Sequence, residues 1–270
     1  MHTMKNNTLM HSQAAPSRHF QHFRQRAAAA AWLALACMAG PALAENSGPT
    51  TPPPFSKLAE GAVPAPWRFA SLPNKTATEF SIATLQGEHV LRVAAHDSYG
   101  NLIYPLRKTA ASNLQLGWRW RVDQLVSKAD IQKKTGDDAA LKLCVSFDFD
   151  KSKLSWGERT KLRMAAINTG EEIPAQTLCY IWDNKQPTGT LLTNAFTSRM
   201  RFIVLQSGSE HLNHWMTEQR DLAADYARAF GDESAHMPDM LGIIVSADAD
   251  NTHGNGLAYV ADIHLDQGKP

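Results

Sequence analysis

The stretch Leu241–Leu265, LGIIVSADADNTHGNGLAYVADIHL, contains two strand-like segments separated by a loop rich in acids and glycines. Residues 241–247 are an apolar run of strand length, and residues 257–265 alternate with a period of two. We therefore predict two strands joined as a hairpin through residues 248–256. The alternation places one set of side chains on a common face: Leu257, Tyr259, Ala261, Ile263 and Leu265.

The loop in this stretch carries Asp248, Asp250 and Asn251 close together. Several hard oxygens on one loop suit calcium, so Asp248 and Asp250 are candidate ligands for that ion. The loop is not an EF-hand, because its sixth position is His253 and its twelfth is Tyr259. The alternative is that these side chains bond the amides of their own loop. No cofactor is required by the sequence, and calcium is the one metal it suggests.

A short helix is predicted just upstream, capped by Thr217 and ending at Gly231. Leu222, Tyr226 and Phe230 recur at helical spacing and form a narrow apolar stripe. The stripe indicates a helix that docks on the rest of the domain.

Polar and aromatic residues around these elements form the candidate ligand site. A tryptophan can stack on a sugar ring, while charged and amide side chains bind its hydroxyls. An ordinary polar contact between helix and sheet is the alternative explanation for the arginine and aspartate of the helix. The candidate ligand-binding residues are Trp215, Arg220, Asp225, Asp248, Asp250, Asn251 and Asp262.

The first 44 residues predict a signal peptide. They contain no acid, and three arginines precede an apolar run at 27–39 and a small-x-small triplet at 42–44. Residues 45–54 are rich in Pro, Thr and Ser and predict a flexible lead-in. We therefore expect a periplasmic or secreted protein.

The charge balance argues against a nucleic-acid partner. Four of the 27 Lys and Arg residues lie in residues 1–44, so cleavage leaves 23 against 26 Asp and Glu, a net charge of about −3. No later stretch is long and apolar enough to span a membrane. The sequence does not indicate an oligomeric state.

Two cysteines, Cys144 and Cys179, remain after cleavage, and each lies in a strand-like run. They can form a disulfide in an oxidising compartment if those strands are neighbours. The alternative is two separately buried thiols, since the chain is large enough to form a core without a disulfide.

The remainder of the chain consists of short alternating runs separated by turn residues. In one of them Trp118 and Trp120 share a face opposite Arg119 and Arg121. Seven to ten such strands with one or two short helices predict a single all-β domain over residues 55–266, an antiparallel β-sandwich of jelly-roll type.

Several segments together resemble the bacterial domain-of-unknown-function 3047 family of exported proteins. They are WRWRV, VSFDFD, CYIW, RDLAADYARAFGDE and GIIVSADADNTHGNGLAYVADI. The family more usually has an arginine-bearing pattern after the paired acids Asp137 and Asp138, where this sequence has Lys142. The resemblance implies an exported β-rich domain and no particular activity.

Two hypotheses of function follow. The first is a non-catalytic module that binds a glycan or another envelope component. The second is a hydrolase or lyase acting on envelope carbohydrate, which needs two carboxyl groups roughly 5–10 Å apart, one with a raised pKa. Its candidate carboxylates are Asp137, Asp138, Asp225, Asp248, Asp250 and Asp262.

Overall fold

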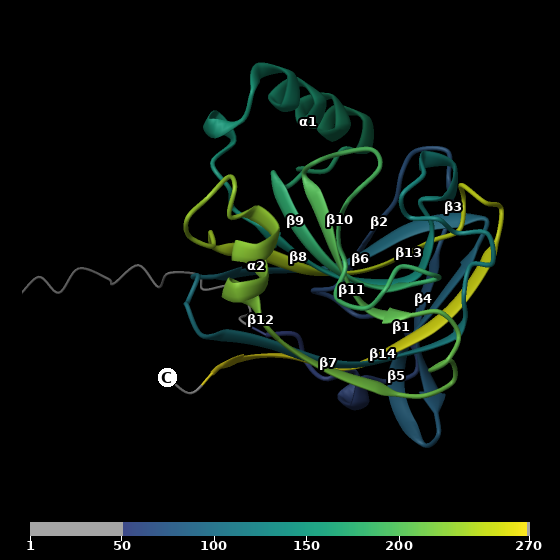
Figure 1. Cartoon of the computed structure of the whole chain (residues 1–270). Helices are drawn as coiled ribbons and strands as arrows, with labels where there is room; N and C mark the ends of the chain where they lie inside the picture. The colour runs from purple at the N-terminus through teal and green to yellow at the C-terminus, as the bar shows by residue number, and fades with distance from the viewer. Residues whose placement is uncertain (1–50, 269–270) are drawn as a thin grey trace, which may run out of the picture. The chain divides into compact units, whose positions relative to one another are not determined.

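The computed structural model describes residues 51–268; the predicted signal peptide and all but the end of the lead-in lie outside the described residues. Over this range the chain is a mainly antiparallel β-sandwich of jelly-roll type, as the sequence predicts (Figure 1). Two sheets face each other, and two α-helices lie beside them.

The six-stranded sheet has its last strand in sequence near its centre. In spatial order its strands are β1 (Gly61–Ala62), β4 (Glu79–Leu85), β5 (Glu88–His96), β14 (Asn255–Gln267), β7 (Leu114–Gln124) and β12 (Met216–Asp221). The tight turn at Gln86 and Gly87 joins β4 to β5, and both residues have positive φ angles, 55° and 84°.

The eight-stranded sheet is built around β8 and β13. In spatial order its strands are β10 (Leu191–Thr193), β11 (Met200–Ser207), β9 (Gln176–Asp183), β8 (Ala139–Phe147), β13 (Met240–Asp248), β6 (Ser98–Lys108) and β2 (Arg68–Ala70). The short strand β3 (Thr76–Ala77) pairs with β6 outside this path. All pairs are antiparallel except β9 with β11 and β3 with β6.

Large aromatic side chains fill the space between the sheets. Trp118 and Trp120 are fully buried, which confirms the inward face predicted for them. Trp118 packs against Tyr180 with ring centroids 5.1 Å apart, and Trp120 against Trp182 at 6.0 Å. Aromatic contacts between β7 of one sheet and β9 of the other therefore stabilise the packing of the two sheets.

The predicted hairpin between the last two strands is wrong. Strand β13 pairs with β6 and β8, whereas β14 pairs with β5 and β7 in the other sheet. The loop observed between these strands, residues 249–254, thus crosses from one sheet to the other. It is longer than the two to five residues typical of hairpin loops, and long enough to span the roughly 10 Å between packed sheets.

The predicted alternation along β14 is also wrong, because a bulge changes the inward face. Ala258 and Val260 are fully buried, and Ile263 and Leu265 beyond the bulge are also buried. Asp262 has a φ of 54°, and the register with β7 shifts at this point. A bulge of this kind adds one residue and reverses the alternation that follows it.

The predicted helix begins later than expected. Residues 216–221 form strand β12 along the edge of β7, and helix α2 (Leu222–Phe230) starts after them. Its cap is Asp221, whose side chain accepts a hydrogen bond from the backbone of Ala224, and not Thr217. Strand pairing takes Thr217 out of helical conformation. The apolar stripe of α2 is fully buried and the helix ends at Gly231, as predicted.

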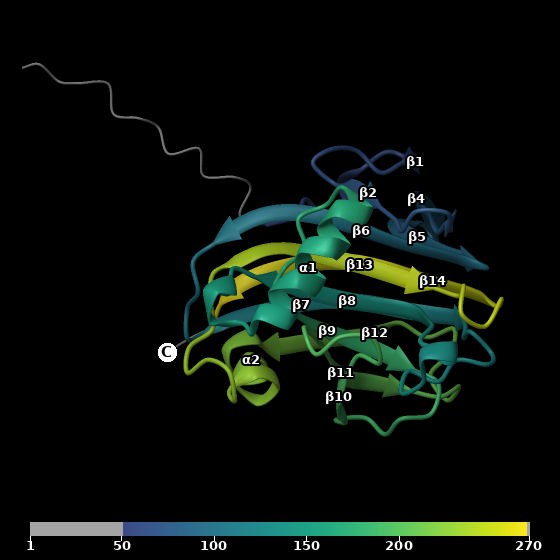
Figure 2. The ribbon, with the colours of Figure 1, turned by 90° about the horizontal axis from the view of Figure 1, so that it is seen from above.

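Helix α1 (Trp156–Thr169) is the longer of the two α-helices. Ser155 and Glu158 form a capping box at its start. The helix lies over the outer face of the eight-stranded sheet, the face turned away from the sandwich core (Figures 1 and 2).

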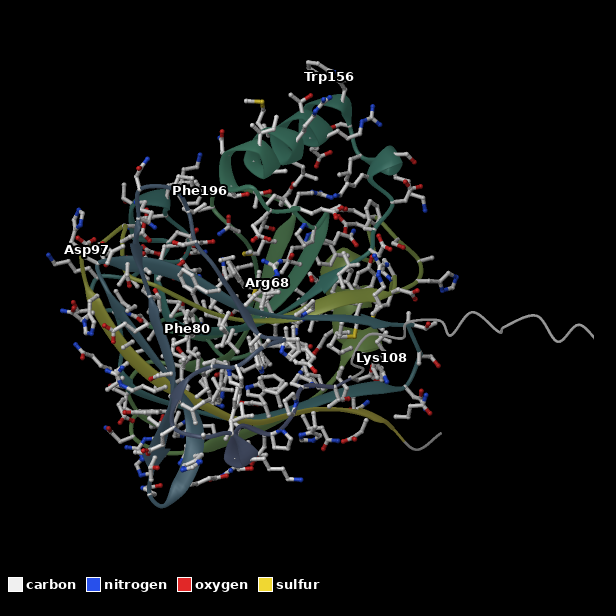
Figure 3. All side chains as sticks on the ribbon, turned by 180° about the vertical axis from the view of Figure 1, so that it is seen from behind. Arg68, Phe80, Asp97, Lys108, Trp156 and Phe196 are labelled. Carbon is white, nitrogen blue, oxygen red and sulfur yellow. A yellow bond between two sulfur atoms is a disulfide. The ribbon has the colours of Figure 1, made fainter. Side chains whose placement is uncertain are left out.

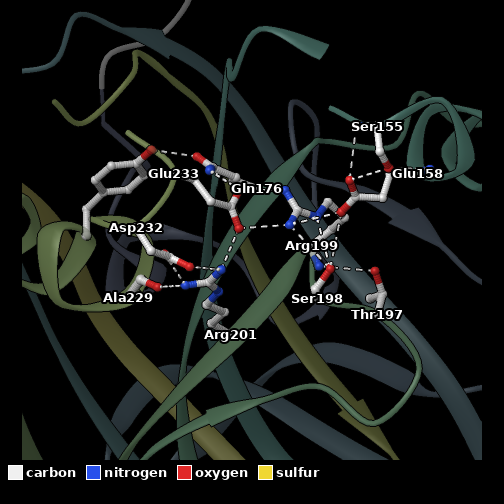
Figure 4. Close-up of polar contacts among 11 residues, drawn as sticks. Ser155, Glu158, Gln176, Thr197, Ser198, Arg199, Arg201, Ala229, Asp232 and Glu233 are labelled. Carbon is white, nitrogen blue, oxygen red and sulfur yellow. Dashed lines mark hydrogen bonds and ion pairs between the residues drawn. The ribbon is translucent and has the colours of Figure 1, made fainter. Parts of the chain in front are cut away.

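A polar network fixes the first turn of α1 to the sheet. Arg199 contacts Glu158 at 3.2 Å and Glu233 at 2.6 Å, so one buried guanidinium joins α1 to the segment after α2 (Figure 4). At the far end, Glu171 pairs with Arg68 of β2 at 2.6 Å. Both ends of α1 are therefore anchored.

A disulfide joins Cys144 on β8 to Cys179 on β9, two residues paired directly across the sheet. Both sulfurs lie on the outer face, in a small apolar cluster with Phe202 and Val204. Within residues 51–268, no helix has the length and hydropathy needed to span a membrane.

Candidate functional site

The residues predicted to form one ligand site lie in three separate places. Trp215 and Asp262 are on the outer face of the six-stranded sheet. Arg220 and Asp225 line the end of the core. The remaining three, on the loop 248–256, sit at the outer face of the eight-stranded sheet.

The first place is organised by Arg119. Its guanidinium donates to Asp262 at 2.8 Å and to Glu88 at 2.6 Å, and it lies 5.2 Å from the centre of the Trp215 ring. The arginine thus covers the aromatic face that a sugar would need. Trp215 is only partly exposed and is not a free platform.

The second place is the Arg220–Asp225 pair. Asp225 is 5% exposed, and both of its oxygens are bonded: Oδ2 accepts from Tyr180 at 2.9 Å and from Arg220 at 2.8 Å, and Oδ1 accepts from Arg220 at 2.6 Å. Burial, together with the charge of Asp225, raises the pKa of Tyr180 well above its ordinary value. Because Tyr180 packs in the core, this pair ties α2 and β12 to β9 and does not face the loop 248–256.

The third place brings together acids and lysines from three distant segments. We call it the Asp–Lys cluster. Its members are Lys75, Asp137, Asp138, Lys142, Asp248 and Asp250. Four carboxylates against two ammonium groups leave an excess of negative charge.

The centre of the Asp–Lys cluster is a buried ion pair. Lys142 Nζ donates to Asp248 Oδ2 at 2.7 Å, and the backbone N–H of Ala139 donates to Asp248 Oδ1 at 2.8 Å. Burial raises the pKa of Asp248 to about 6, although Lys142 opposes the change. Burial also disfavours the charge of Lys142, but attraction to Asp248 and Asp137 outweighs it and raises the pKa of the amine to about 12.

Asp138 has a structural part in the cluster. Its Oδ2 accepts from the backbone and hydroxyl of Thr252 at 2.8 and 2.6 Å, and its Oδ1 accepts from the backbone of Asn251 at 3.1 Å. The carboxylate therefore holds the crossing loop. Asn251 points its amide back at Asp138 and Asp137, so its polar atoms serve this loop.

Asp137 and Asp250 differ from the other two acids, because each has one buried oxygen without a hydrogen-bond partner. Asp137 is 6% exposed and bonds only through Oδ2, to Asn194 at 2.6 Å. Asp250 is 8% exposed and bonds only through Oδ2, to Lys75 at 2.6 Å. Burial raises the pKa of Asp137, and the charge of Asp250 contributes. A buried acceptor without a donor costs free energy. Both oxygens are covered by the protein, so they become candidates for ligand contact when the neighbouring side chains move.

The two candidate calcium ligands are paired with lysines. Asp248 faces Lys142, and Asp250 faces Lys75. Residues 51–268 contain no group of three or more His, Cys, Asp or Glu side chains arranged to hold a metal ion.

Exposed apolar side chains lie beside the Asp–Lys cluster. Phe196 is 58% exposed, two residues after the Asn194 that bonds Asp137, and Lys134 lies 5.5 Å from its ring centre. The turn before Lys75 lines an open groove of about 510 Å³ with Leu72 and Pro73. The opposite wall of this groove is formed by Ala165, Asn168 and Thr169 of α1.

Sequence reasoning did not include Lys75, Asn194 or Phe196 in the site. They lie more than 50 positions from the acids they accompany, and no local motif marks them. Only the tertiary contacts of Lys75 with Asp250 and of Asn194 with Asp137 bring them together.

Comparison with known proteins gives the family. The model of the family described as "Protein of unknown function (DUF3047)" matches residues 65–264. The chain belongs to this family. The match covers the entire Asp–Lys cluster and all strands of the two sheets except β1 and the end of β14. Among curated proteins, none matches the sequence.

Solved structures with similar chain paths are distant. The Cel12A catalytic domain of Humicola grisea is 12% identical with a TM-score of 0.38, over 78% of this chain and 99% of that chain. A loop-swap mutant of Xyn11A from Necallimastix patriciarum is 12% identical with a TM-score of 0.33, over 71% and 89%. The glycoside hydrolase domain of Endo-D from Streptococcus pneumoniae R6 is 8% identical with a TM-score of 0.29, over 74% of this chain and only 21% of that chain. These values are too low to support an argument about activity.

Proposed function

We propose that this DUF3047 protein is an exported, non-catalytic module that binds a glycan or another hydroxyl-rich envelope component at the Asp–Lys cluster. The observation that carries the proposal is the pair of buried, unbonded oxygens on Asp137 and Asp250. Sugar hydroxyls are donors of the kind these oxygens need, and they carry no charge that would have to be desolvated.

The surroundings of the cluster support the same ligand class. Phe196 offers an exposed aromatic face on which a sugar ring can stack. Lys75 is 40% exposed at its side chain and can donate to a ring or hydroxyl oxygen while still pairing with Asp250. The groove between Leu72 and α1 gives a second saccharide unit room beside the cluster.

A melting-temperature screen against soluble envelope polysaccharide fragments tests the proposal, with calcium and with a chelator in parallel. A ligand of the native state raises the midpoint in proportion to its occupancy. We expect a shift with a glycan that is lost in Asp250→Asn and in Phe196→Ala. The matched control is Asp262→Asn, an ion-paired acid on the other sheet, which should keep the shift.

Two outcomes would count against this reading. A shift that Asp262→Asn abolishes and Asp250→Asn preserves would move the site to the six-stranded sheet. A shift with calcium alone would assign the acidic loop to a structural ion.

A carbohydrate hydrolase or lyase is the second candidate. The observation that favours it is the raised pKa of two neighbouring acids, Asp137 and Asp248, because burial shifts each carboxyl group toward the protonated form that a general acid needs. Release of new chain ends from a glycan that binds would establish catalysis. Asp137→Asn should then abolish turnover.

A further inference from the structure

Helix α1 exposes an apolar stripe to solvent. Trp156, Met164 and Ile167 are 76%, 52% and 65% exposed. At 3.6 residues per turn, the three positions fall within about 80° of one another around the helix axis. Figure 3 shows Trp156 at the end of α1 farthest from the sheets.

The stripe lies opposite the face that α1 turns to the domain. Glu158, Leu162 and Ala165 are half-buried and occupy that inner face. Leu162 packs on a small cluster with Phe149 and Leu154, and Glu158 meets Arg199. The exposed stripe is therefore not needed to attach α1 to the sheet.

Basic residues surround the apolar stripe. Residues 151–170 contain five Lys or Arg and one acid, although the chain after residue 44 is acidic overall. Lys153, Arg159, Lys161 and Arg163 are exposed, and within residues 51–268 none of these four side chains takes part in an ion pair. The one acid, Glu158, is engaged by Arg199.

We propose that α1 docks on the surface of an anionic lipid membrane. A helix with tryptophan and aliphatic side chains on one face and lysines and arginines beside them is suited to lie in the headgroup region, where the indole ring is also favoured. The positive charges complement anionic lipid, each contributing attraction near the surface. Anchoring of α1 at both ends presents the stripe as a preformed surface.

This surface is separate from the proposed glycan contacts. Phe196, two residues after the Asn194 that bonds Asp137, lies on the same side of the molecule as α1 in Figure 3, and Trp156 of the stripe is well separated from it. Membrane docking would thus hold the cluster close to the envelope surface without blocking it.

Co-sedimentation with lipid vesicles tests the proposal, using protein purified from expressing cells with its N-terminus established by mass spectrometry. Vesicles of phosphatidylcholine with about 30% phosphatidylglycerol are compared with pure phosphatidylcholine. We expect binding to the anionic vesicles that weakens at high salt. Trp156→Ser combined with Ile167→Ser should weaken it at least roughly tenfold, because the buried apolar area is lost. Arg159→Gln combined with Arg163→Gln should weaken it by a similar factor.

Two control variants test whether vesicle binding depends specifically on α1 or results from nonspecific adsorption of the protein. Leu191→Ser removes an apolar side chain exposed on β10, and Lys57→Gln removes an exposed charge near the start of the domain. Both should bind vesicles as the wild type does. The proposal is overturned if the wild type ignores anionic vesicles, which would favour a protein partner for α1, or if the double variants bind them undiminished.

Discussion

The Arg220–Asp225 pair and the Asp–Lys cluster both bury acids beside cations, yet their bonding is different. Asp225 has both oxygens occupied by Arg220 and Tyr180. In the Asp–Lys cluster, Asp137 and Asp250 each leave one oxygen without a donor. A complete set of bonds suits a fixed structural joint, whereas incomplete bonding leaves capacity for a ligand. The bonding of each acid, more than its burial, separates the two regions.

The largest expected effect on stability comes from removing Asp225 from the fully bonded Arg220–Asp225 pair. Asp225→Ala should lower the free energy of unfolding by about 3–5 kcal/mol, because it leaves Arg220 and Tyr180 without their partner. Chemical denaturation measures the loss. The control Asp262→Asn weakens a more exposed ion pair, keeps a residue type that tolerates the positive φ of this position, and should cost about 1 kcal/mol or less. Equal losses in the two variants would show that the Arg220–Asp225 pair is no more structural than a surface contact.

A pH dependence is expected from the centre of the Asp–Lys cluster. The pKa of Asp248 is raised from 3.8 to about 6, so folding favours its protonated form. The resulting contribution to the free energy of unfolding is fully present below the unfolded pKa and is lost as pH rises through about 6. The shift of the pKa corresponds to about 3 kcal/mol. The raised pKa of Lys142 adds no slope in this window, because that contribution is lost only near pH 12.

Denaturation curves between pH 4 and pH 7 measure this dependence. The wild type should lose stability over that range relative to Asp248→Asn, which retains an acceptor for the backbone of Ala139 and has no carboxyl group to titrate. Parallel curves for the two proteins would assign the pH dependence to other groups.

The smallest expected effect on stability is at Asp137, an acid with one unbonded oxygen. Asp137→Asn removes a buried charge with an unbonded oxygen and keeps an acceptor for Asn194, so stability should change by less than about 1 kcal/mol, in either direction. The glycan-dependent melting shift should nevertheless be lost. Thermal denaturation with and without the glycan measures both quantities. A loss of stability as large as that of Asp225→Ala would instead make Asp137 a structural acid.

The strands of this fold were predictable because their patterns are local. The alternation around Trp118 and Trp120 reports directly which face is buried, and so does the stripe of α2. The bulge at Asp262 could not be read in the same way, because one inserted residue reverses the pattern without leaving a motif of its own. Strand β12 was not predicted, because its polar sequence is compatible with a helix as well as with an edge strand.

The candidate site was only partly predictable, for a topological reason. Asp248 and Asp250 stand out in sequence, but their partners Lys142 and Lys75 come from strands and turns more than 100 residues away. Arg220 and Asp225 are near the same loop in sequence and lie in another part of the structure. Proximity along the chain is a poor guide when consecutive strands enter different sheets.

The central place of β14 in the six-stranded sheet has a consequence for how the chain folds. His96 of β5 pairs with Asn255, 159 positions later, so β5 and β7 become neighbours of a common strand only after residues 255–267 have been synthesised. Contacts of such long sequence separation slow folding. The earlier strands must therefore wait for the last one, and a chain that stops before residue 255 would have two half-sheets with unpaired edges in place of a native domain.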